Sequence, residues 1–370
     1  MKDDLVMNQL TRIPLSGTFE LTARCNLRCK MCLVRLDPGR MAELGGRERT
    51  AAEWIDMASQ VKRAGTLRLL LTGGEPMLRE DFSEIYEAIA GMGFYLTLYT
   101  NASMLNEEIF GLLRRLPPHK LGVTIYGASA ETYKNVSGDA NAYEKTIKGI
   151  KRLSELPSEI DLQTTIIKDN LSDFDAILKL GAALNKGKKM DVSRIVTMPV
   201  RGAQADAAGC RLSPEENVAL HFHEVKYLYE KLQPLGKWQE FAEYFIAKDK
   251  QQASAKRVRE RSKPYLYGCE AGVDSYCISW DGRLLGCQLL DGAWTLPFET
   301  GFEQAWNDFP NQVRLPKPDE TCVRCEMSGN CAACPATRLA ETGSLTGPVD
   351  YFCREAFSIQ PFSLREKPGK

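Results

Sequence analysis

A regular alternation of strand-like and helix-like segments through the first 200 residues most constrains the fold. Short runs rich in β-branched and aromatic residues recur at 17–22, 67–72, 95–100, 120–126, 160–167 and 190–198. Between them, apolar residues recur every three to four positions, as on one helix face, at 51–64, 82–92, 107–115, 143–153 and 171–184. This alternation predicts a parallel sheet with helices outside it. Six strand units are visible where a closed barrel needs eight, so we expect an α/β fold with an open, partial (β/α)6 barrel.

The pattern changes after residue 213. Ser213 can cap a helix that starts at Pro214, with Glu216 completing the capping box. The helical pattern continues to residue 262, and a cysteine-rich segment follows it. We therefore expect three parts, a barrel core, a helical bridge and a cysteine-rich module, at residues 1–213, 214–262 and 263–370.

Composition excludes several classes of partner. Lys plus Arg and Asp plus Glu both number 48, and this balance predicts no nucleic-acid partner and no membrane surface. The first residues lack the apolar region of a secretory signal, and no run of about 18 apolar residues could cross a bilayer. We expect a cytoplasmic protein.

Twelve cysteines are unevenly distributed along the chain. In a reducing cytoplasm they are not expected to form structural disulfides, and their clustering with two-residue gaps favours metal or iron–sulfur ligation. Cys210 stands alone. Its simplest interpretation is a small buried apolar residue, and the alternative is a catalytic hydrogen donor or acceptor, because it follows the sixth strand.

The first cysteine group is a C-x3-C-x2-C loop after the first strand, formed by Cys25, Cys29 and Cys32. Three thiolates can hold three irons of a [4Fe–4S] cube and leave one iron without a protein ligand. The amino and carboxylate groups of an amino acid could fill that position. Gly73 and Gly74 follow the second strand and would let the backbone approach such a ligand closely. Their alternative interpretation is an ordinary strand-to-helix turn.

Other unusual residues also follow strands. In parallel βα barrels, functional groups collect at the carboxyl ends of the strands. The cysteine loop and the GGEP motif (Gly73, Gly74, Glu75 and Pro76) follow the first two strands, and Asn101 ends the third. Thr165 and Arg201 end the fifth and sixth. We expect all of these residues to converge on one rim.

The cysteine loop together with GGEP resembles the radical S-adenosylmethionine (SAM) superfamily. The resemblance implies that Cys25, Cys29 and Cys32 hold a [4Fe–4S] cluster whose open iron binds SAM. One electron, from a flavodoxin- or ferredoxin-type donor, then cleaves SAM to methionine and a 5′-deoxyadenosyl radical that abstracts a substrate hydrogen. Such oxygen-sensitive cofactors carry the hard chemistry, while the protein positions them.

The same resemblance assigns further SAM contacts. The four GGEP residues should contact the methionyl end, and Met31 stands where relatives usually have an aromatic residue. Thr124 and Tyr126 replace a serine and an aspartate found near the ribose in many relatives, so the resemblance does not extend to that strand. By location, the remaining candidate SAM contacts are Asn101, Thr165, Asn170 and Arg201.

Eight more cysteines lie between residues 269 and 353. Eight thiolates can make two closed tetrathiolate sites, which are structural or transfer electrons. A zinc ribbon is the alternative for the C-x2-C-x5-C-x2-C part. The whole pattern resembles a SPASM domain, which carries two auxiliary [4Fe–4S] clusters, although the spacing from Cys331 to Cys334 is one residue short. The resemblance implies one cluster on Cys269, Cys277, Cys287 and Cys334 and the other on Cys322, Cys325, Cys331 and Cys353.

SPASM relatives mostly modify peptides or proteins, by thioether or carbon–carbon crosslinking, epimerisation or oxidation. We therefore expect a peptide or protein substrate. Sulfatase maturation is disfavoured, because Gln288 stands where those enzymes have an aspartate, and an amide cannot act as a base. The short segment before the first strand leaves leader-peptide recognition to another region or to a separate leader-binding protein.

Two alternatives stay open. A small-molecule substrate would place the chain beside the dehydrogenases of aminoglycoside synthesis, which carry a shortened C-terminal module. A non-catalytic iron–sulfur or zinc-binding scaffold is the alternative from another class. GGEP beside an open cluster site argues against the scaffold.

Overall fold

The computed structural model describes residues 12–188, 190–232, 266–267, 269–314, 316–317 and 319–363. The chain divides into two compact units. The first comprises Met1–Arg211 and Glu270–Arg314, and the second comprises Leu212–Cys269 and Leu315–Lys370.

One sheet of nine strands organises the first unit, in the order β6-β5-β4-β3-β2-β1-β7-β8-β9. The expected six parallel strands are present as β1 (Ser16–Glu20), β2 (Arg68–Thr72), β3 (Tyr95–Thr100), β4 (Lys120–Thr124), β5 (Glu159–Thr165) and β6 (Asp191–Ser193). Neighbouring strands pair in parallel from β1 to β6. The prediction of an α/β fold with a partial barrel is therefore confirmed.

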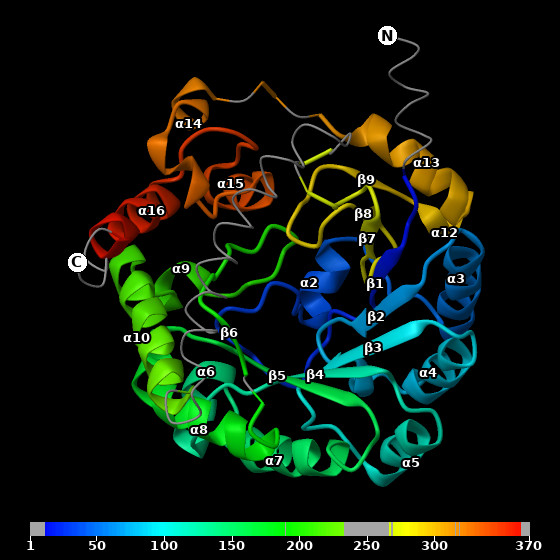
Figure 1. The fold of residues 1–370 in the computed structure, drawn as a ribbon. Helices are drawn as coiled ribbons and strands as arrows, with labels where there is room; N and C mark the ends of the chain where they lie inside the picture. Colours follow the sequence, from blue (N-terminus) through cyan, green and yellow to red (C-terminus); the bar gives the residue numbers. More distant parts are fainter. Residues whose placement is uncertain are drawn as a thin grey trace. The chain divides into compact units, whose positions relative to one another are not determined.

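Helices cover the outside of these strands, as Figure 1 shows. They are α3 (Ala51–Arg63), α4 (Phe82–Ala90), α5 (Glu107–Arg115), α7 (Ala142–Leu153) and α8 (Phe174–Leu184). A capping box between Thr50 and Glu53 begins α3. Its buried Trp54 packs on Phe19 of β1 with ring centroids 4.9 Å apart, which fastens helix to sheet.

Several short elements were not visible as sequence patterns. They are α2 (Pro38–Glu43), η1 (Pro76–Leu78), α6 (Ala130–Ser137), η2 (Lys168–Asp173) and α9 (Ala207–Cys210). Local capping rather than periodicity defines them. Asp37 caps α2, Ser129 caps α6, and Gly138 ends α6 with a left-handed conformation.

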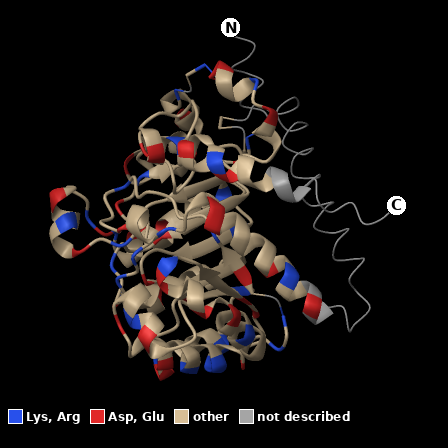
Figure 2. Cartoon of the chain, turned by 90° about the vertical axis from the view of Figure 1, so that its left-hand side faces the viewer, with Lys and Arg blue, Asp and Glu red and all other residues tan. Residues whose placement is uncertain are grey.

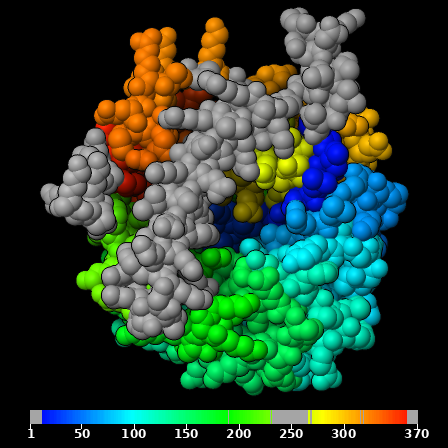
Figure 3. Space-filling view, in the orientation of Figure 1, coloured from blue at the N-terminus to red at the C-terminus, as the bar shows by residue number. Residues whose placement is uncertain are grey.

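The sheet also extends beyond the expected barrel. β7 (Ser275–Ile278) pairs in parallel with β1, placing Cys277 opposite Thr18, and β8 (Leu284–Leu285) and β9 (Trp294–Thr295) continue antiparallel. In Figure 3 the yellow residues of this segment lie against the blue residues near the start of the chain. Gly17 makes the pairing close, because a side chain there would overlap the Tyr276 ring.

The expected domain boundaries differ from the observed units. Glu270–Arg314, expected in a separate module at 263–370, belongs with the barrel because β7 hydrogen-bonds to β1. This segment also carries α12 (Pro297–Thr300) and α13 (Phe302–Gln312). The expected helical bridge at 214–262 begins as α10 (Pro214–Leu232), and its remainder lies outside the described residues.

The second unit contains α10 and a set of short C-terminal helices. These are α14 (Glu320–Val323), η4 (Glu326–Gly329), α15 (Pro335–Thr342) and α16 (Asp350–Ser363). α10 and α16 pack together, with the Asn217 amide donating to the Glu355 carboxylate at 2.6 Å. An exposed Arg354–Glu215 ion pair at 2.9 Å joins the same two helices.

Charges of both signs are interspersed over the described residues in Figure 2, as the zero net charge suggests. None of the helices in the described ranges combines the length and apolar character that crossing a membrane requires.

Candidate active site

The cysteine loop leaves the carboxyl end of β1 and presents three free thiols, Cys25, Cys29 and Cys32, all half-buried. Backbone N–H groups point at two of the sulfurs. Leu27 N lies 3.4 Å from Cys25 Sγ, and Arg35 N lies 3.2 Å from Cys32 Sγ. The loop therefore turns its amides toward the thiols, as a thiolate site requires.

The GGEP loop lies directly against the cysteine loop. Gly74 N donates to Thr22 O at 2.7 Å, and Glu75 N donates to Arg24 O at 2.9 Å. A side chain on Gly73, whose φ is +141°, would overlap the Thr22 backbone, and one on Gly74 would overlap the Arg24 carbonyl. The sequence suggested that these glycines make room for a ligand. In the structure they first make room for the cysteine loop itself.

Glu75 ties GGEP to the end of β3. Its fully buried carboxylate accepts hydrogen bonds from Met77 N at 3.1 Å, Thr100 Oγ1 at 2.8 Å and Asn101 N at 2.8 Å. Burial nevertheless raises the pKa of Glu75 to about 7, because desolvation outweighs these three donors. Pro76, the last residue of the motif, is buried at the start of η1.

Asn101 points toward the cysteine loop. Its amide nitrogen donates to Asn26 Oδ1 at 2.9 Å and lies 3.8 Å from Cys25 Sγ. Its amide oxygen accepts the Ser103 backbone N–H at 2.9 Å. The structure thus gives this side chain a place around the first cysteine, and its contact with SAM stays a prediction.

Tyr126, after β4, is a site residue to which the sequence assigned no contact with the cysteines. Its hydroxyl lies within hydrogen-bonding reach of the Cys29 thiol, and its ring packs against the apolar cluster that contains Met31. Burial raises the pKa of Tyr126 well above its usual range. The resemblance offered only an aspartate near the ribose at this position. A single sequence does not show that a tyrosine here lies beside Cys29.

Met31 lies in an apolar cluster with Val136, Ile167, Val196, Ala207 and Cys210. Cys210 is 3% exposed, and its Sγ lies 3.6 Å from Ala207 O within α9. This placement favours packing over chemistry for Cys210, and its catalytic role stays a prediction.

Two other candidates hold backbone rather than open space. Asn170 is fully buried, accepts the Ile167 N–H at 2.8 Å, and donates to Tyr126 O and Thr165 O at 3.0 and 3.1 Å. It therefore fastens the ends of β4 and β5 together beside the thiols. Thr165 ends β5 and pairs with Ser193 of β6, and its SAM contact stays a prediction.

Arg201 is engaged by protein groups. Its guanidinium forms a bidentate ion pair with Glu20, at 2.7 and 2.6 Å, and its Nε donates to Gln288 O at 2.9 Å. Its expected contact with SAM stays a prediction, and the structure favours a role in joining β1 to the segments after β6 and β8.

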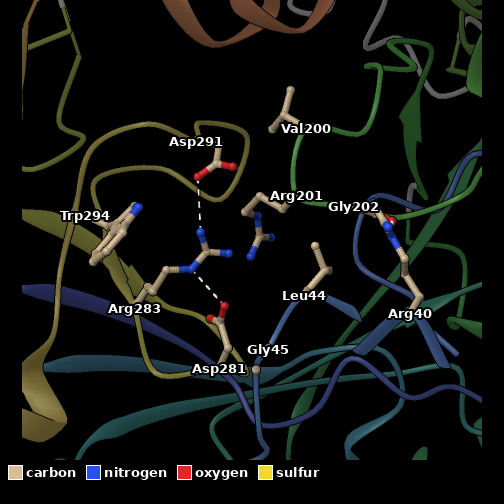
Figure 4. Close-up of a pocket in the computed structure, with 11 residues that line it drawn as sticks. Arg40, Leu44, Gly45, Val200, Arg201, Gly202, Asp281, Arg283, Asp291 and Trp294 are labelled. Atoms are coloured by element: carbon tan, nitrogen blue, oxygen red, sulfur yellow. Dashed lines mark hydrogen bonds and ion pairs between the residues drawn. The ribbon is translucent and has the colours of Figure 1, made fainter. Parts of the chain in front are cut away.

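A cavity of about 420 Å³ adjoins Arg201. Its walls come from α2 and the following loop, the segment after β6, and the segments around β8 and β9. Figure 4 shows the guanidinium groups of Arg201 and Arg283 pointing toward one another, with Arg283 between Asp281 and Asp291. Leu44 and Trp294, 43% and 40% exposed, add apolar surface. The cavity therefore combines charged and apolar walls.

The rear cysteines are divided between the units. Cys277 and Cys287 belong to the barrel unit, where Cys277 is buried beside Glu20 and the Leu289 N–H lies 3.4 Å from Cys287 Sγ. Burial and the Glu20 carboxylate raise the pKa of Cys277. Cys269 and Cys334 lie in the second unit. The first auxiliary cluster, on these four residues, stays a prediction.

The second set lies within one unit. Burial raises the pKa of the Cys353 thiol, and the nearby thiols of Cys331, Cys322 and Cys325 raise it further. The Arg338 guanidinium lies 3.3 Å from Cys322 Sγ. Among the described residues, no three Cys, His, Asp or Glu side chains lie close enough to hold a single metal ion. Cluster thiolates bind separate irons, so the second auxiliary cluster is not tested by this finding and stays a prediction.

The three front thiols fit a cationic cofactor on chemical grounds. Burial raises the pKa of Cys25 to about 12 and that of Cys29 still further. A nearby positive group stabilises thiolates whose pKa burial has raised in this way. Iron ligation deprotonates such thiols outright.

The comparisons agree with this geometry. The family model described as "Radical SAM superfamily" matches residues 19–181. That range includes the end of β1, the cysteine loop, GGEP and the strands from β2 to β5. Residues 19–181 are a radical SAM domain. Proteins of this family bind SAM and a [4Fe–4S] cluster.

Curated relatives extend beyond the radical SAM domain. An AdoMet-dependent heme synthase from Methanosarcina barkeri (strain Fusaro / DSM 804) is 28% identical over 98% of this chain and 100% of its own length. A PqqA peptide cyclase from Rhizobium meliloti (strain 1021) is 23% identical over 91% of this chain and 86% of its own. The first of these similarities is long enough to include the rear cysteine region.

Among solved structures, Streptococcus suis SuiB bound to the precursor peptide SuiA has a TM-score of 0.65. The match covers 95% of this chain and 78% of SuiB, with 16% sequence identity. At this identity the likeness shows that the fold around the radical SAM domain is shared.

Proposed function

We propose that this protein is an enzyme that reductively cleaves SAM and uses the resulting 5′-deoxyadenosyl radical to abstract a hydrogen atom from a peptide or protein. A flavodoxin- or ferredoxin-type donor would supply the electron. Cleavage of SAM would then give methionine and the radical. The single observation that carries the proposal is the contact between the three-thiol loop and GGEP. Gly73 and Gly74 place the GGEP backbone against the loop that carries Cys25, Cys29 and Cys32.

The chain's own residues would hold the cofactors at that contact. The three thiolates would bind a [4Fe–4S] cluster, which supplies a single electron at low potential when present. The GGEP residues, with Met31 and Asn101 beside them, would bind SAM. Glu75 fixes the GGEP loop through its three buried hydrogen bonds.

A peptide substrate is supported by two of the similar proteins. The curated relative from Rhizobium meliloti is named a peptide cyclase, and SuiB was crystallised with a precursor peptide. The proposal extends to two auxiliary [4Fe–4S] clusters on the rear cysteines, to a separate leader-peptide-binding protein and to a cytoplasmic location.

A small molecule is the second candidate substrate. One observation favours it, since the heme synthase from Methanosarcina barkeri aligns with all of its length against nearly all of this chain. The cavity beside Arg201 is compatible with either class, because it combines charged and apolar walls.

Anaerobic reconstitution with iron and sulfide tests the proposal. With dithionite and SAM, the wild-type protein should form 5′-deoxyadenosine, and Cys32→Ala should not. Deuterium should appear in 5′-deoxyadenosine when a candidate peptide substrate is supplied in deuterated form. A deuterated porphyrin that transfers its label instead would favour the small-molecule class. No 5′-deoxyadenosine, with zinc at the rear cysteines, would identify a scaffold.

A further inference from the structure

Each of two front cysteines has a polar side chain directed at its sulfur from a different strand. We propose that Tyr126 and Asn101 are positioning residues that donate hydrogen bonds to the cluster thiolates of Cys29 and Cys25 and raise the reduction potential of the cluster. This inference rests on the proposed function, because it assumes that the three thiols hold a cluster. The inference does not require Tyr126 or Asn101 to contact the substrate.

Tyr126 reaches Cys29 from the end of β4. Its hydroxyl lies within hydrogen-bonding reach of the Cys29 thiol, and all three cysteines lie close enough to interact electrostatically with it. A neutral phenol carries one O–H donor. When Cys29 is an iron-bound thiolate with no proton of its own, the phenol is the only partner of the two that can donate.

The tyrosine is held in place from three sides. Asn170 donates to its backbone oxygen at 3.0 Å, the Tyr133 ring packs edge-on with centroids 5.7 Å apart, and its own ring lies against the apolar cluster around Met31. Asn170 is fixed in turn by the Ile167 N–H. Because these contacts fix the side chain, its hydroxyl should stay directed at the Cys29 sulfur when the cluster gains an electron.

Asn101 reaches Cys25 from the end of β3. Its amide nitrogen lies 3.8 Å from Cys25 Sγ, a long contact that sulfur acceptors allow, and shares its second proton with Asn26 Oδ1 at 2.9 Å. Its oxygen accepts from Ser103 N at 2.9 Å and Ser103 Oγ at 2.6 Å, which settles the orientation of the amide. The nitrogen therefore faces the sulfur.

These donors act on the cluster through charge. Adding an electron makes the thiolate sulfurs more negative, so a hydrogen bond to sulfur stabilises the reduced state more than the oxidised state. Removing one donor should therefore lower the potential. A loss on the scale of one hydrogen bond would lower the ratio of reduced to oxidised cluster roughly fivefold at fixed potential, about 40 mV for a one-electron couple.

Potentiometric titration followed by low-temperature EPR tests the inference on the reconstituted full chain. The signal to follow is the one that changes when SAM is added to a parallel sample, which separates it from signals of other clusters. The titration itself is run without SAM, so its result does not depend on SAM cleavage. Iron and sulfide content is measured for every variant, and samples are compared at equal content.

Tyr126→Phe removes only the hydroxyl and should shift the midpoint to lower potential. Tyr143→Phe is the matched control, because Tyr143 packs on Tyr133 at 5.4 Å and lies one ring further along the same stack. Asn101→Asp should also lower the midpoint, since it replaces the donor with a negative charge. Asn106→Asp is its control, because either side chain can cap α5 through Ile109 N.

Equal midpoints for Tyr126→Phe, Tyr143→Phe and wild type, at equal iron content, would overturn the assignment of Tyr126. A midpoint of Asn101→Asp equal to that of Asn106→Asp would overturn the assignment of Asn101. A wild-type protein that binds iron and titrates but forms no 5′-deoxyadenosine would contradict the proposed function and leave the measured shift intact. The two failures are therefore distinguishable.

Discussion

Arg201 forms a buried bidentate ion pair with Glu20 although four strands separate their elements in the sheet. Glu20 ends β1 and Arg201 follows β6, and their atoms approach to 2.6 and 2.7 Å with exposed side-chain fractions of 0% and 4%. The sheet must curl for the two ends to meet. An ion pair therefore joins the end of β1 to the segment that follows β6, where a full barrel would have further strands.

Arg201→Met should strongly destabilise the barrel unit. It leaves Glu20 buried without its partner, which typically costs about 3–5 kcal/mol. The same change at the exposed Arg115, which pairs with Glu87, should cost only about 0.2–1 kcal/mol. Urea unfolding followed by circular dichroism measures both. The double variant Glu20→Leu/Arg201→Met should recover most of the lost stability. Equal stability of Arg201→Met and Arg115→Met would contradict the importance of the buried pair.

Gly74→Ala should prevent cluster assembly. A methyl group there would overlap the Arg24 carbonyl, so the GGEP loop or the cysteine loop must shift. Gly111→Ala is the matched control, because nothing lies within 4 Å of a side chain on that helical glycine. It should stabilise α5 by about 0.5–1 kcal/mol. Iron content after reconstitution should fall by about one third in the first variant alone, because one of the three proposed [4Fe–4S] clusters is lost, and normal iron content in Gly74→Ala would contradict this contact.

Glu75→Gln should weaken the link between GGEP and β3. The amide nitrogen of glutamine cannot accept from Met77 N or Asn101 N, so one buried N–H loses its partner. Such a loss costs about 1–3 kcal/mol. The melting temperature of this variant should fall, and its dissociation constant for SAM should rise. Unchanged values for both would show that the buried carboxylate is not needed as an acceptor.

Acid should remove a contribution of Glu53 to stability. The Arg47 guanidinium and the Thr50 backbone lower the pKa of Glu53 from 4.5 to about 2. Because the folded-state pKa is depressed, the contribution is fully present above pH 4.5 and is lost as the pH falls toward 2. Thermal unfolding of metal-free protein should be measured at pH 5.5 and at pH 3. The melting temperature should fall less between these two pH values for Glu53→Gln than for wild type. Equal drops would contradict the prediction.

Much of the barrel could be predicted because its signals are local. Periods of two and of about 3.6 residues locate β1 to β6 and the main helices. The cysteine loop and GGEP follow β1 and β2, and topology alone brings them to one rim. The contact between Gly74 and Arg24 O explains both motifs together.

Other features depend on long-range contacts that a single sequence does not contain. β7 is a four-residue strand, and only its pairing with β1 places Cys277 in the barrel unit. Tyr126 and Asn170 have no motif, and their partners become visible only when β4 and β5 lie side by side. Arg201 follows a strand as expected, but its partner Glu20 lies 181 residues away in the sequence.

The central claim is that the loop of Cys25, Cys29 and Cys32 holds a cluster with one iron open to SAM. Low-temperature EPR of the anaerobically reduced protein, recorded with and without SAM, tests it most directly. The account predicts that one cluster signal shifts on addition of SAM, and that Cys29→Ala lacks this signal while any others remain. A wild-type spectrum that contains reduced clusters and does not change with SAM would contradict the account.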